Sequence, residues 1–367
     1  MVFLIFTCNF IVKFSNNPVL ANTNVTIYIL ADGSIQPPTA PINRDGDVYY
    51  FTDNITIHAD GIIIQKDGIT IDGAGFTLQG PGKEVTVNAK YLTGIKIEMV
   101  SNVEIRNITI TDYGYGVTLS HATNNNITNC KFLACIWGIK VIDASFFNIV
   151  SYNEFMAEGG IAISDSSHNY VTNNVFKGSR TQIVIGGPRN TVAGNNITGS
   201  DTGISIANGY WDDYETTSYN EVYNNNIIGC RYGMYLQFYV ANNTIFGNTI
   251  KSCTYCIYFY NNYPKNNKFY HNNFIFNTYQ IRIPDSPICR NIWDNGCLGG
   301  NYWSDYAYSD SNHDGFGDVP YIINDYNKDN YPLMEQYVIP EFSSPIIPLS
   351  LMITTLLVVI IYKKKNH

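Results

Sequence analysis

Charged side chains are scarce in this sequence, and basic ones are the scarcer kind. Asp, Glu, Lys and Arg make up 14% of the 367 residues, and the formal net charge is -8. A basic stripe that could follow a phosphate backbone is missing, which excludes nucleic acid as a partner. The leucine and helix signals of leucine-rich repeats are missing too. The 29 glycines and 29 tyrosines, with abundant Asn and Ile, instead favour strands and tight turns.

Both ends of the chain predict export. Residues 1–21 begin with an apolar stretch and end in a candidate cleavage site, as a signal peptide does. Residues 345–362 form an uncharged run, which as a helix would span ~27 Å and cross a bilayer core. We expect a transmembrane anchor at 346–362 and a basic cytoplasmic tail at 363–367. The rest of the chain then lies on the extracellular face of the membrane, because basic residues stay inside.

A four-residue apolar alternation recurs through the middle of the chain. Its copies start at Gly94, Gly116, Gly138, Gly160, Gln182, Gly203, Gly233, Cys256 and Gln280. The steps between copies are 22, 22, 22, 22, 21, 30, 23 and 24 residues, a regularity that indicates a solenoid. About half a period later an Asn recurs, followed five residues on by a second Asn, as at Asn148 and Asn153.

This repeat predicts an all-β fold, a right-handed parallel β-helix of coils of about 22 residues, with a C-terminal transmembrane helix. Stacking the coils at ~4.8 Å places Ile over Ile inside and Asn over Asn at the corners. We expect an N-terminal cap and first coils at 22–93 and the repeats at 94–298. An Asp/Gly-rich segment at 299–338 and a linker at 339–345 would follow.

Two further features suit an exported, repeated chain. Cys230 and Cys253 each precede a copy of the motif by three residues on successive coils, so they should lie within disulfide reach. Asn-X-Thr sequons for N-glycosylation are typical of a secreted surface. They occur at Asn24, Asn54, Asn107, Asn126, Asn196 and Asn242.

Segments around the repeats are distinctive as well: GITIDGAGFTLQG at 68–80, GGNYWSDY at 299–306, HDGFGDVPYII at 313–323 and YPLM at 331–334. Together with the repeats they resemble the NosD-like group of parallel β-helix proteins, also described as carbohydrate-binding and sugar-hydrolysis repeats, and especially their archaeal cell-surface members. The sequence IPEF at 339–342, followed by an apolar run and lysines, is similar to archaeal PEF-type sorting signals. That likeness implies processing by a sortase-like membrane enzyme.

Copper enters through the same resemblance, because NosD-like proteins are linked with copper delivery for nitrous oxide reductase. The sequence itself does not support copper. Its histidines are dispersed, and no Cys/His/Met cluster of the copper type is present.

The register of the repeat predicts which side chains share a column on the outer surface. The third position of each motif faces outward, which gives Lys96, Thr118, Lys140, Ala162, Val184, Ser205, Tyr235, Tyr258 and Arg282. Tyr235 and Tyr258 should therefore be neighbours, and two aromatic faces with polar edges suit the stacking of a sugar. The alternative is that this pair only stabilises the sheet, as cross-strand Tyr pairs do.

A second column contains acidic residues. His121, Asp143 and Asp165 each lie five residues after the start of a motif, so they should stack about one strand spacing apart. Two carboxylates ~5 Å apart could act as the acid and nucleophile of a glycosidase, or hold a cation together with His121. The alternative is a solvated turn, because no Arg or Lys signature of a polysaccharide lyase lies beside them.

The 30-residue step between Gly203 and Gly233 contains an insertion, NGYWDDYETT. An insertion in a solenoid leaves the stack as a surface loop, and such loops often contain binding residues. The candidate ligand contacts in it are Trp211, Asp212, Asp213 and Tyr214. The alternative is a loop without a ligand.

After the coils, alternating oxygen donors and a central glycine follow the pattern of a calcium loop. The donors would come from Asp310, Asn312, Asp314, Phe316 and Asp318. The loop departs from the EF-hand at its twelfth position, where Tyr321 replaces the expected bidentate Glu. The alternative is an Asp/Gly-rich turn without metal.

Three functions remain open at this stage. We favour a surface-anchored protein that binds glycans or cell-surface partners without catalysis. The first alternative is a polysaccharide lyase, hydrolase or epimerase that uses Asp143, Asp165 and the Trp211 loop. The second is a NosD-like periplasmic copper-associated protein.

Overall fold

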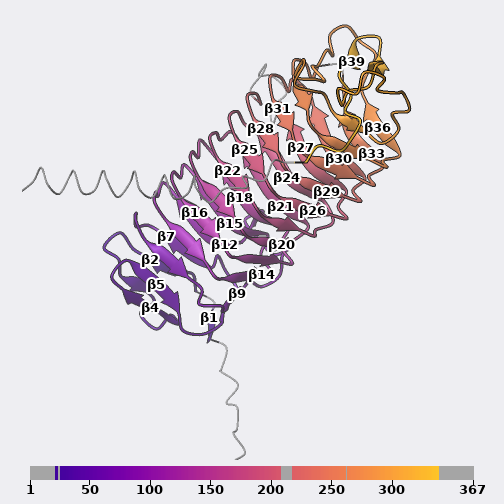
Figure 1. Ribbon diagram of the computed structural model, residues 1–367. Helices are drawn as coiled ribbons and strands as arrows, with labels where there is room; N and C mark the ends of the chain where they lie inside the picture. Colours follow the sequence, from indigo (N-terminus) through magenta and orange to yellow (C-terminus); the bar gives the residue numbers. More distant parts are fainter. Residues whose placement is uncertain (1–20, 24, 208–216, 262, 339–367) are drawn as a thin grey trace, which may run out of the picture.

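The computed structural model describes residues 21–23, 25–207, 217–261 and 263–338, which wind into stacked coils (Figure 1). Each coil contributes one strand to each of three sheets, here called A, B and C. The predicted parallel β-helix is confirmed, and each coil has three strands. In the described part of the chain we find no helix of the length and apolar character needed to cross a membrane. The linker at 339–345, the anchor at 346–362 and the tail at 363–367 lie outside the described residues, as does the signal peptide up to its last residue.

Sheet B contains the apolar repeat motif and, within the described residues, has 12 strands. In spatial order they are β3 (Ile35–Gln36), β2 (Ile27–Ile29), β7 (Ile62–Ile64), β12 (Thr93–Glu98), β15 (Tyr115–Ser120), β18 (Trp137–Ile142), β21 (Gly159–Ser164), β24 (Thr181–Gly186), β27 (Thr202–Ala207), β30 (Tyr232–Gln237), β33 (Tyr255–Phe259) and β36 (Tyr279–Arg282).

Sheets C and A complete each coil, in that order along the chain. The 11 described strands of sheet C are β4 (Ile42–Asp45), β5 (Val48–Phe51), β8 (Thr70–Asp72), β13 (Glu104–Arg106), β16 (Asn126–Thr128), β19 (Ile149–Ser151), β22 (Tyr170–Thr172), β25 (Thr191–Ala193), β28 (Glu221–Tyr223), β31 (Thr244–Phe246) and β34 (Lys268–Tyr270). The 12 described strands of sheet A are β1 (Ala21–Thr23), β6 (Ile55–Ile57), β9 (Thr77–Gln79), β14 (Thr109–Thr111), β17 (Lys131–Leu133), β20 (Glu154–Met156), β23 (Val175–Phe176), β26 (Asn196–Thr198), β29 (Asn226–Ile228), β32 (Thr249–Lys251), β35 (Asn273–Ile275) and β37 (Tyr302–Trp303).

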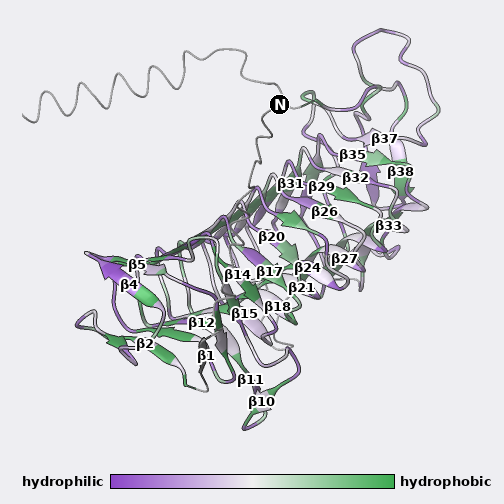
Figure 2. Ribbon diagram, turned by 90° about the horizontal axis from the view of Figure 1, so that it is seen from below, coloured by the Kyte–Doolittle hydropathy of each residue, from purple (hydrophilic) through white to green (hydrophobic). Residues whose placement is uncertain are grey.

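Two small hairpins stand apart from these sheets. The hairpin of β10 (Thr86–Val87) and β11 (Lys90–Tyr91) projects from the coil stack (Figure 2). The hairpin of β38 (Tyr321–Asn324) and β39 (Asn327–Asp329) belongs to the C-terminal segment.

The first strands of sheets B and C differ from the rest because they pair antiparallel. Strand β3 runs antiparallel to β2, and β4 runs antiparallel to β5. Every other strand pairing within sheets A, B and C is parallel in the part described. At the other end Trp293 and Trp303 are buried against the last coil, and Tyr321 stacks on Trp303 at 4.0 Å. Both ends of the core are thus covered by chain outside the repeat, which protects the sheet from pairing with another molecule.

Apolar side chains of all three sheets meet inside the coils. Phe132, Phe155 and Phe176 stack on successive strands of sheet A, with ring centroids 4.8 and 4.6 Å apart. The glycine that opens most copies of the motif makes room for this column. A Cβ atom at Gly138 would lie 2.5 Å from the Phe155 ring, and one at Gly160 would lie 2.5 Å from Phe176.

Two columns of buried asparagines join the coils at the turns. The first Asn ladder follows sheet B and runs through Asn125, Asn148, Asn169, Asn190, Asn220, Asn243, Asn267, Asn291 and Asn327. The second Asn ladder precedes sheet A and runs through Asn153, Asn174, Asn195, Asn225, Asn248, Asn272 and Asn301. At most steps the backbone and side-chain nitrogens of one Asn both donate to the side-chain oxygen of the next, so the predicted stacking is confirmed.

The second Asn ladder ends on a buried carboxylate, Asp329. One of its oxygens accepts hydrogen bonds from the backbone nitrogen of Asn301 at 2.7 Å and from the indole nitrogen of Trp303 at 2.9 Å. The other oxygen accepts the backbone N–H of Tyr331 at 3.0 Å. Burial nevertheless raises the pKa of Asp329 to about 6, because these donors only partly offset the loss of water.

This shift predicts a pH dependence for the C-terminal end. From about pH 4 to about pH 6 the folded state holds a proton that the unfolded state has released. The free energy of unfolding should therefore fall as pH rises through that window, by on the order of 3 kcal/mol, and the contribution should stay constant above it. The Asp329→Asn variant should lack this dependence.

Urea unfolding of both proteins at a series of pH values measures the difference directly. Asp325→Asn is the control, because Asp325 is an exposed carboxylate on the same segment. A gap between wild type and Asp329→Asn that does not change with pH would contradict the assignment.

Candidate functional site

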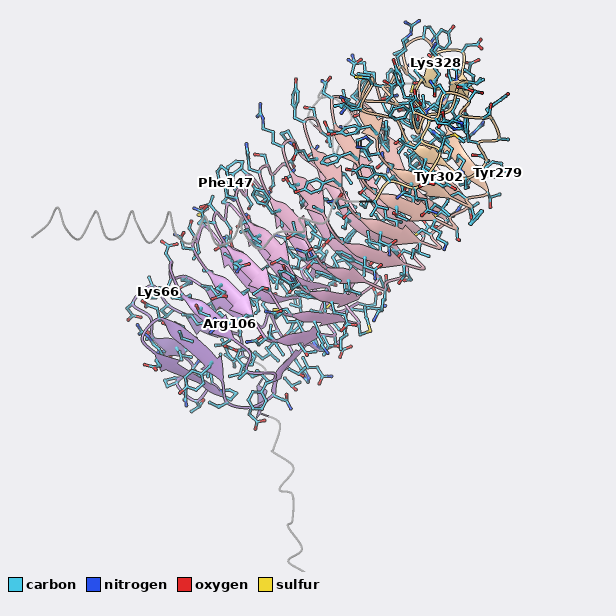
Figure 3. The ribbon with its side chains drawn as sticks, viewed as in Figure 1. Lys66, Arg106, Phe147, Tyr279, Tyr302 and Lys328 are labelled. Carbon is cyan, nitrogen blue, oxygen red and sulfur yellow. The ribbon has the colours of Figure 1, made fainter. Side chains whose placement is uncertain are left out.

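The outer surface of sheet B gathers tyrosines on its last three strands. Six of them form what is here called the tyrosine face: Tyr232, Tyr235, Tyr255, Tyr258, Tyr260 and Tyr279. The predicted neighbours Tyr235 and Tyr258 pair in register, with ring centroids 5.4 Å apart. Tyr260 and Tyr279 are 54% and 53% exposed, and Tyr279 lies beside the last coils (Figure 3).

A second row of this face was not predicted. Tyr232, Tyr255 and Tyr279 pair in register and stack at 5.3 and 5.0 Å, with the rings within 17° of parallel. The residue after Tyr232 explains the row, since a Cβ atom at Gly233 would lie 2.5 Å from Ile250 and must point inward. The residue before the motif therefore faces outward, and tyrosine at that position in three successive copies was the signal in the sequence.

Polar groups complete the tyrosine face. The guanidinium of Arg231 lies 4.9 Å from the ring centroid of Tyr232. Burial, with other tyrosines nearby, raises the pKa of Tyr235 to about 12, so its hydroxyl stays protonated and can donate a hydrogen bond at neutral pH. Gln237 donates to the hydroxyl of Ser205 at 3.2 Å on the neighbouring strand. The surface thus offers ring faces together with donors.

The three strands before the tyrosine face present small outward side chains. In the predicted column these are Ala162, Val184 and Ser205, and their register is confirmed. Beyond them, aromatic and basic groups return on β15 and β18. The Lys140 ammonium lies 4.7 Å from the ring centroid of Tyr115, and burial lowers the pKa of Lys140. The outer surface of sheet B therefore has small side chains on its middle strands and aromatic side chains on the strands to either side of them.

The predicted insertion falls outside the described residues, and so do its candidate ligand contacts Trp211, Asp212, Asp213 and Tyr214. The insertion follows Ala207 at the end of β27, and Ala207 pairs with Gln237 of β30. The last described residue before the insertion is therefore on the strand next to the tyrosine face.

The acidic column follows the predicted order on successive coils. His121, Asp143 and Asp165 are exposed and all have positive φ, between 48° and 54°. Their backbones are linked, because His121 N–H donates to the Asp143 carbonyl at 3.0 Å. The hydroxyl of Ser120 donates to Asp143 at 2.9 Å and lies 3.2 Å from the ring of His121. His121 and Asp143 thus share one hydroxyl.

Asp165 has a different setting one coil further on. It lines a pocket of about 350 Å³ together with Gly186, Pro188, Arg189 and Tyr219. The Arg189 guanidinium lies 5.7 Å from the Tyr219 ring centroid. This pocket opens beside the turns that link sheet B to sheet C. Within this pocket, Asp165 has a basic neighbour, Arg189, and an aromatic one, Tyr219. Asp143 does not line the pocket.

The oxygen donors of the predicted calcium loop point into the loop itself. Asp310 accepts the N–H groups of Asp314 and Gly315 at 3.2 and 2.9 Å. Asp318 accepts both the N–H and the hydroxyl of Ser311, which hold the pKa of Asp318 below its usual value. Asn312 donates to Asp314 at 3.0 Å, and Asp314 in turn accepts the N–H of Phe316 at 3.0 Å. The carboxylates of the loop are thus hydrogen-bonded to backbone N–H groups of the same loop.

The sequence is similar to known proteins. The family model described as "Periplasmic copper-binding protein (NosD)" matches residues 15–158, 54–237 and 157–308. A cell surface glycoprotein of Methanothermus fervidus is 28% identical over an alignment of 226 residues, and the match covers 56% of this chain and 35% of that protein. The chain thus spans about a third of the length of this relative.

The fold is similar to solved structures. A single-residue variant of the catalytic domain of GH87 alpha-1,3-glucanase, in complex with nigerose, matches with a TM-score of 0.55 and 14% identity over 77% of this chain and 63% of that chain. Another structure of this domain with nigerose matches with a TM-score of 0.50 and 15% identity over 69% of this chain and 62% of that chain. At such identities the likeness shows the fold alone.

A copper site would need soft or imidazole ligands close together. In the ranges that the structure describes, no three His, Cys, Asp or Glu side chains gather as a metal site. His168 lies against Phe147, and His271 contacts the Leu298 carbonyl at 2.7 Å. Burial raises the pKa of Cys130 to about 12, which opposes the thiolate that binds metal. The side chains within the described residues do not fit copper.

Cys230 and Cys253 meet on successive coils, as the register predicted. Both are buried free thiols in the structure, and they form a hydrogen bond with each other. Both lie at the turn from sheet A to sheet B on successive coils, and the Cys230 carbonyl accepts the N–H of Thr254 at 3.1 Å. The disulfide itself stays a prediction.

Protein exported through an oxidising compartment should contain the Cys230–Cys253 bond. Digestion without reductant, followed by mass spectrometry, should yield the two cysteine peptides joined. Cys130 and Cys135 provide the control, because they are buried free thiols at two different turns of one coil and should be recovered singly. Recovery of Cys230 and Cys253 as alkylated thiols from the same digest would refute the bond.

Proposed function

The chain belongs to the NosD family, and from this membership and the geometry of sheet B we propose that the protein binds a glycan through its tyrosine face. The single observation that favours this is the two rows of contacting tyrosines on β30, β33 and β36, of which one is stacked and the other tilted. Aromatic rings present apolar area with a polar edge, which matches the apolar face and surrounding hydroxyls of a sugar ring. Arg231 and Gln237 add hydrogen-bond donors beside the rings.

We place this binding outside the cell, on a chain held at the membrane by its C-terminal segment. Support comes from the sequence of both ends and from the relative named as a cell surface glycoprotein. Because the tyrosine face lies on the last three strands of sheet B, its ligand would be bound on the coils that are nearest to such an anchor in the sequence. The partner would then be a glycan or another cell-surface molecule.

Catalysis on a polysaccharide is the second candidate. It is supported by the hydroxyl that His121 and Asp143 share and by the pocket at Asp165. The acid would be one of the two carboxylates and the nucleophile the other. The exposed position of all three residues favours binding over catalysis, because a general acid at neutral pH usually needs a desolvated carboxyl group.

The double variant Tyr235→Ala with Tyr258→Ala should lose glycan binding. Removing two stacked rings removes about 1–3 kcal/mol of aromatic contact, so affinity should fall roughly tenfold or more. A glycan array identifies the best ligand of the wild type, and calorimetry with that ligand measures the loss. Tyr223→Ala is the matched control. Tyr223 also stacks on a ring, with its centroid 4.8 Å from that of Phe246, but both residues are on sheet C and not on sheet B.

Release of reducing ends from the same ligand separates binding from catalysis. Binding without turnover would support the proposal. Turnover that disappears in Asp143→Asn would support the second candidate. Equal affinity of the wild type and the double tyrosine variant would contradict a role for the tyrosine face.

We further propose a calcium ion in the loop of Asp310, Asn312, Asp314, Phe316 and Asp318. The oxygens that now accept loop amides would turn toward the ion, with Phe316 contributing its backbone carbonyl. The role would be structural. Phe316 and Gly315 line the same pocket as Leu333 and Met334, so an ordered loop would steady the cover of the C-terminal coils.

Calcium should raise the melting temperature of the wild type and give heat in a calorimetric titration. Asp314→Asn should weaken both effects, because a neutral ligand replaces a charged one. Asp285→Asn, an exposed carboxylate outside the loop, should leave them unchanged. Neither heat nor a melting shift in the wild type would refute the ion.

A further inference from the structure

The sequons are unevenly distributed over the three sheets. Five lie in the described residues. Asn126 is on β16 of sheet C, and Asn196 is on β26 of sheet A. Asn54 and Asn107 lie on turns from sheet C to sheet A, and Asn242 lies on a turn from sheet B to sheet C. Among the described strands of sheet B there is no sequon.

The folded chain leaves two of the five asparagines exposed. Whatever the time of transfer, a glycosylated amide nitrogen must reach solvent in the folded protein. Asn54 is half-buried, and its side-chain oxygen accepts the N–H of Thr77 at 2.9 Å. The side-chain oxygen of Asn126 is buried without a partner, and Asn242 is half-buried. Asn107 and Asn196 are exposed.

Asn196 has the more open geometry of the two. On β26 Asn196 and Thr198 face outward, and Ile197 between them is fully buried. The side-chain oxygen of Asn196 accepts a hydrogen bond from Asn226 at 3.1 Å. That bond fixes the amide plane while its nitrogen, within the described residues, donates to no other group. Asn107 is on a left-handed turn, where its nitrogen donates to Asp72 at 3.2 Å from an exposed position.

We infer that Asn107 and Asn196 are N-glycosylated, and that these glycans cover sheet A and the turn that leads to it from sheet C, while the outer face of sheet B stays bare for its partner. The second half of this inference rests on the proposed function. In the transfer, the amide nitrogen forms a bond to the anomeric carbon of a lipid-linked sugar phosphate. The bond from that carbon to the phosphate oxygen breaks, and the nitrogen loses one proton to a base as the lipid phosphate leaves.

The outer face of sheet B is only one substitution away from a sequon at two places. Ser120 and Ser164 each lie two residues after an outward position, as the Thr of a sequon on a strand does. The residues at those positions are Thr118 and Ala162 instead of Asn. Sheets A and C each have Asn-Ile-Thr in this geometry, at Asn196 and Asn126. Asn-rich composition alone does not account for the difference between the sheets, because the required Ser is present on sheet B.

Glycopeptide mapping tests the two sites without reference to any ligand. The full chain is produced in a host that N-glycosylates, and peptides containing the five described sequons are compared. We expect glycans on Asn107 and Asn196, and unmodified Asn54, Asn126 and Asn242. Thr198→Ala should remove the glycan from Asn196 while leaving the asparagine in place. Unmodified Asn107 and Asn196, or a glycan on Asn54 or Asn126, would overturn the assignment.

A glycan placed on sheet B tests the bare face. Ala162→Asn creates a sequon with Ser164 on β21, three strand spacings or ~14 Å from Tyr235. Its glycan should reduce affinity for the array-selected glycan at least tenfold. Ala162→Gln enlarges the side chain without creating a sequon. Its affinity should equal that of Ala162→Asn made in a host that does not N-glycosylate. Asn196→Gln should bind as tightly as the wild type.

The outcomes separate the two proposals. If the wild-type protein binds no glycan of the array, the proposed function fails. The mapping still decides whether Asn107 and Asn196 are glycosylated. If the wild type binds and glycosylated Ala162→Asn binds equally well, sheet B is not the contact face. In that case the inference fails although glycan binding stands.

Discussion

The hydrogen bond from one buried Asn to the next fixes the spacing on which every outer surface of this protein depends. From Asn148 and Asn153 onward, each coil turns twice at an asparagine whose side chain satisfies a backbone N–H of the coil before it. A buried N–H without a partner would cost about 1–3 kcal/mol, so a coil of different length or register is disfavoured at each turn. Because these turns fix the length of each coil, the outward columns on sheet B stay in register, and the tyrosine face is one of them.

The repeat made much of the fold and part of the site predictable. Its period placed Tyr235 beside Tyr258 and Cys230 beside Cys253, because stacking turns a sequence interval into a neighbour. Tyr232, Tyr255 and Tyr279 escaped prediction, because the chain bends at the glycine position and turns the preceding residue outward. The insertion at 208–216 and the linker beyond 338 interrupt the period, so register offers no guide there. Trp293 and Trp303 follow the last full copy of the motif, and their place in the core depends on the segment that folds back over it.

The two ends of the coil stack are built on different principles. At the start, sheets B and C begin with antiparallel strands that use backbone hydrogen bonds to close the edge. At the end, a carboxylate takes the last donors of an amide ladder, and indole rings fill the opening. The C-terminal arrangement contains a buried carboxylate, whereas the buried titratable group at the N-terminal end is the phenol of Tyr49, which donates to the Gly33 carbonyl at 2.8 Å.

All the amides of an Asn ladder point the same way, with nitrogens toward the C-terminal end and oxygens toward the N-terminal end. Every internal coil of a ladder therefore accepts these bonds from the coil before it and donates them to the coil after it. A gene that gained or lost a whole internal coil would leave both terminal arrangements untouched, and the new neighbours would find complementary partners. The length of the molecule can thus change in steps of one coil. A coil gained or lost before β30 would change the distance between the tyrosine face and the N-terminal end of the stack, and neither terminal arrangement would have to change.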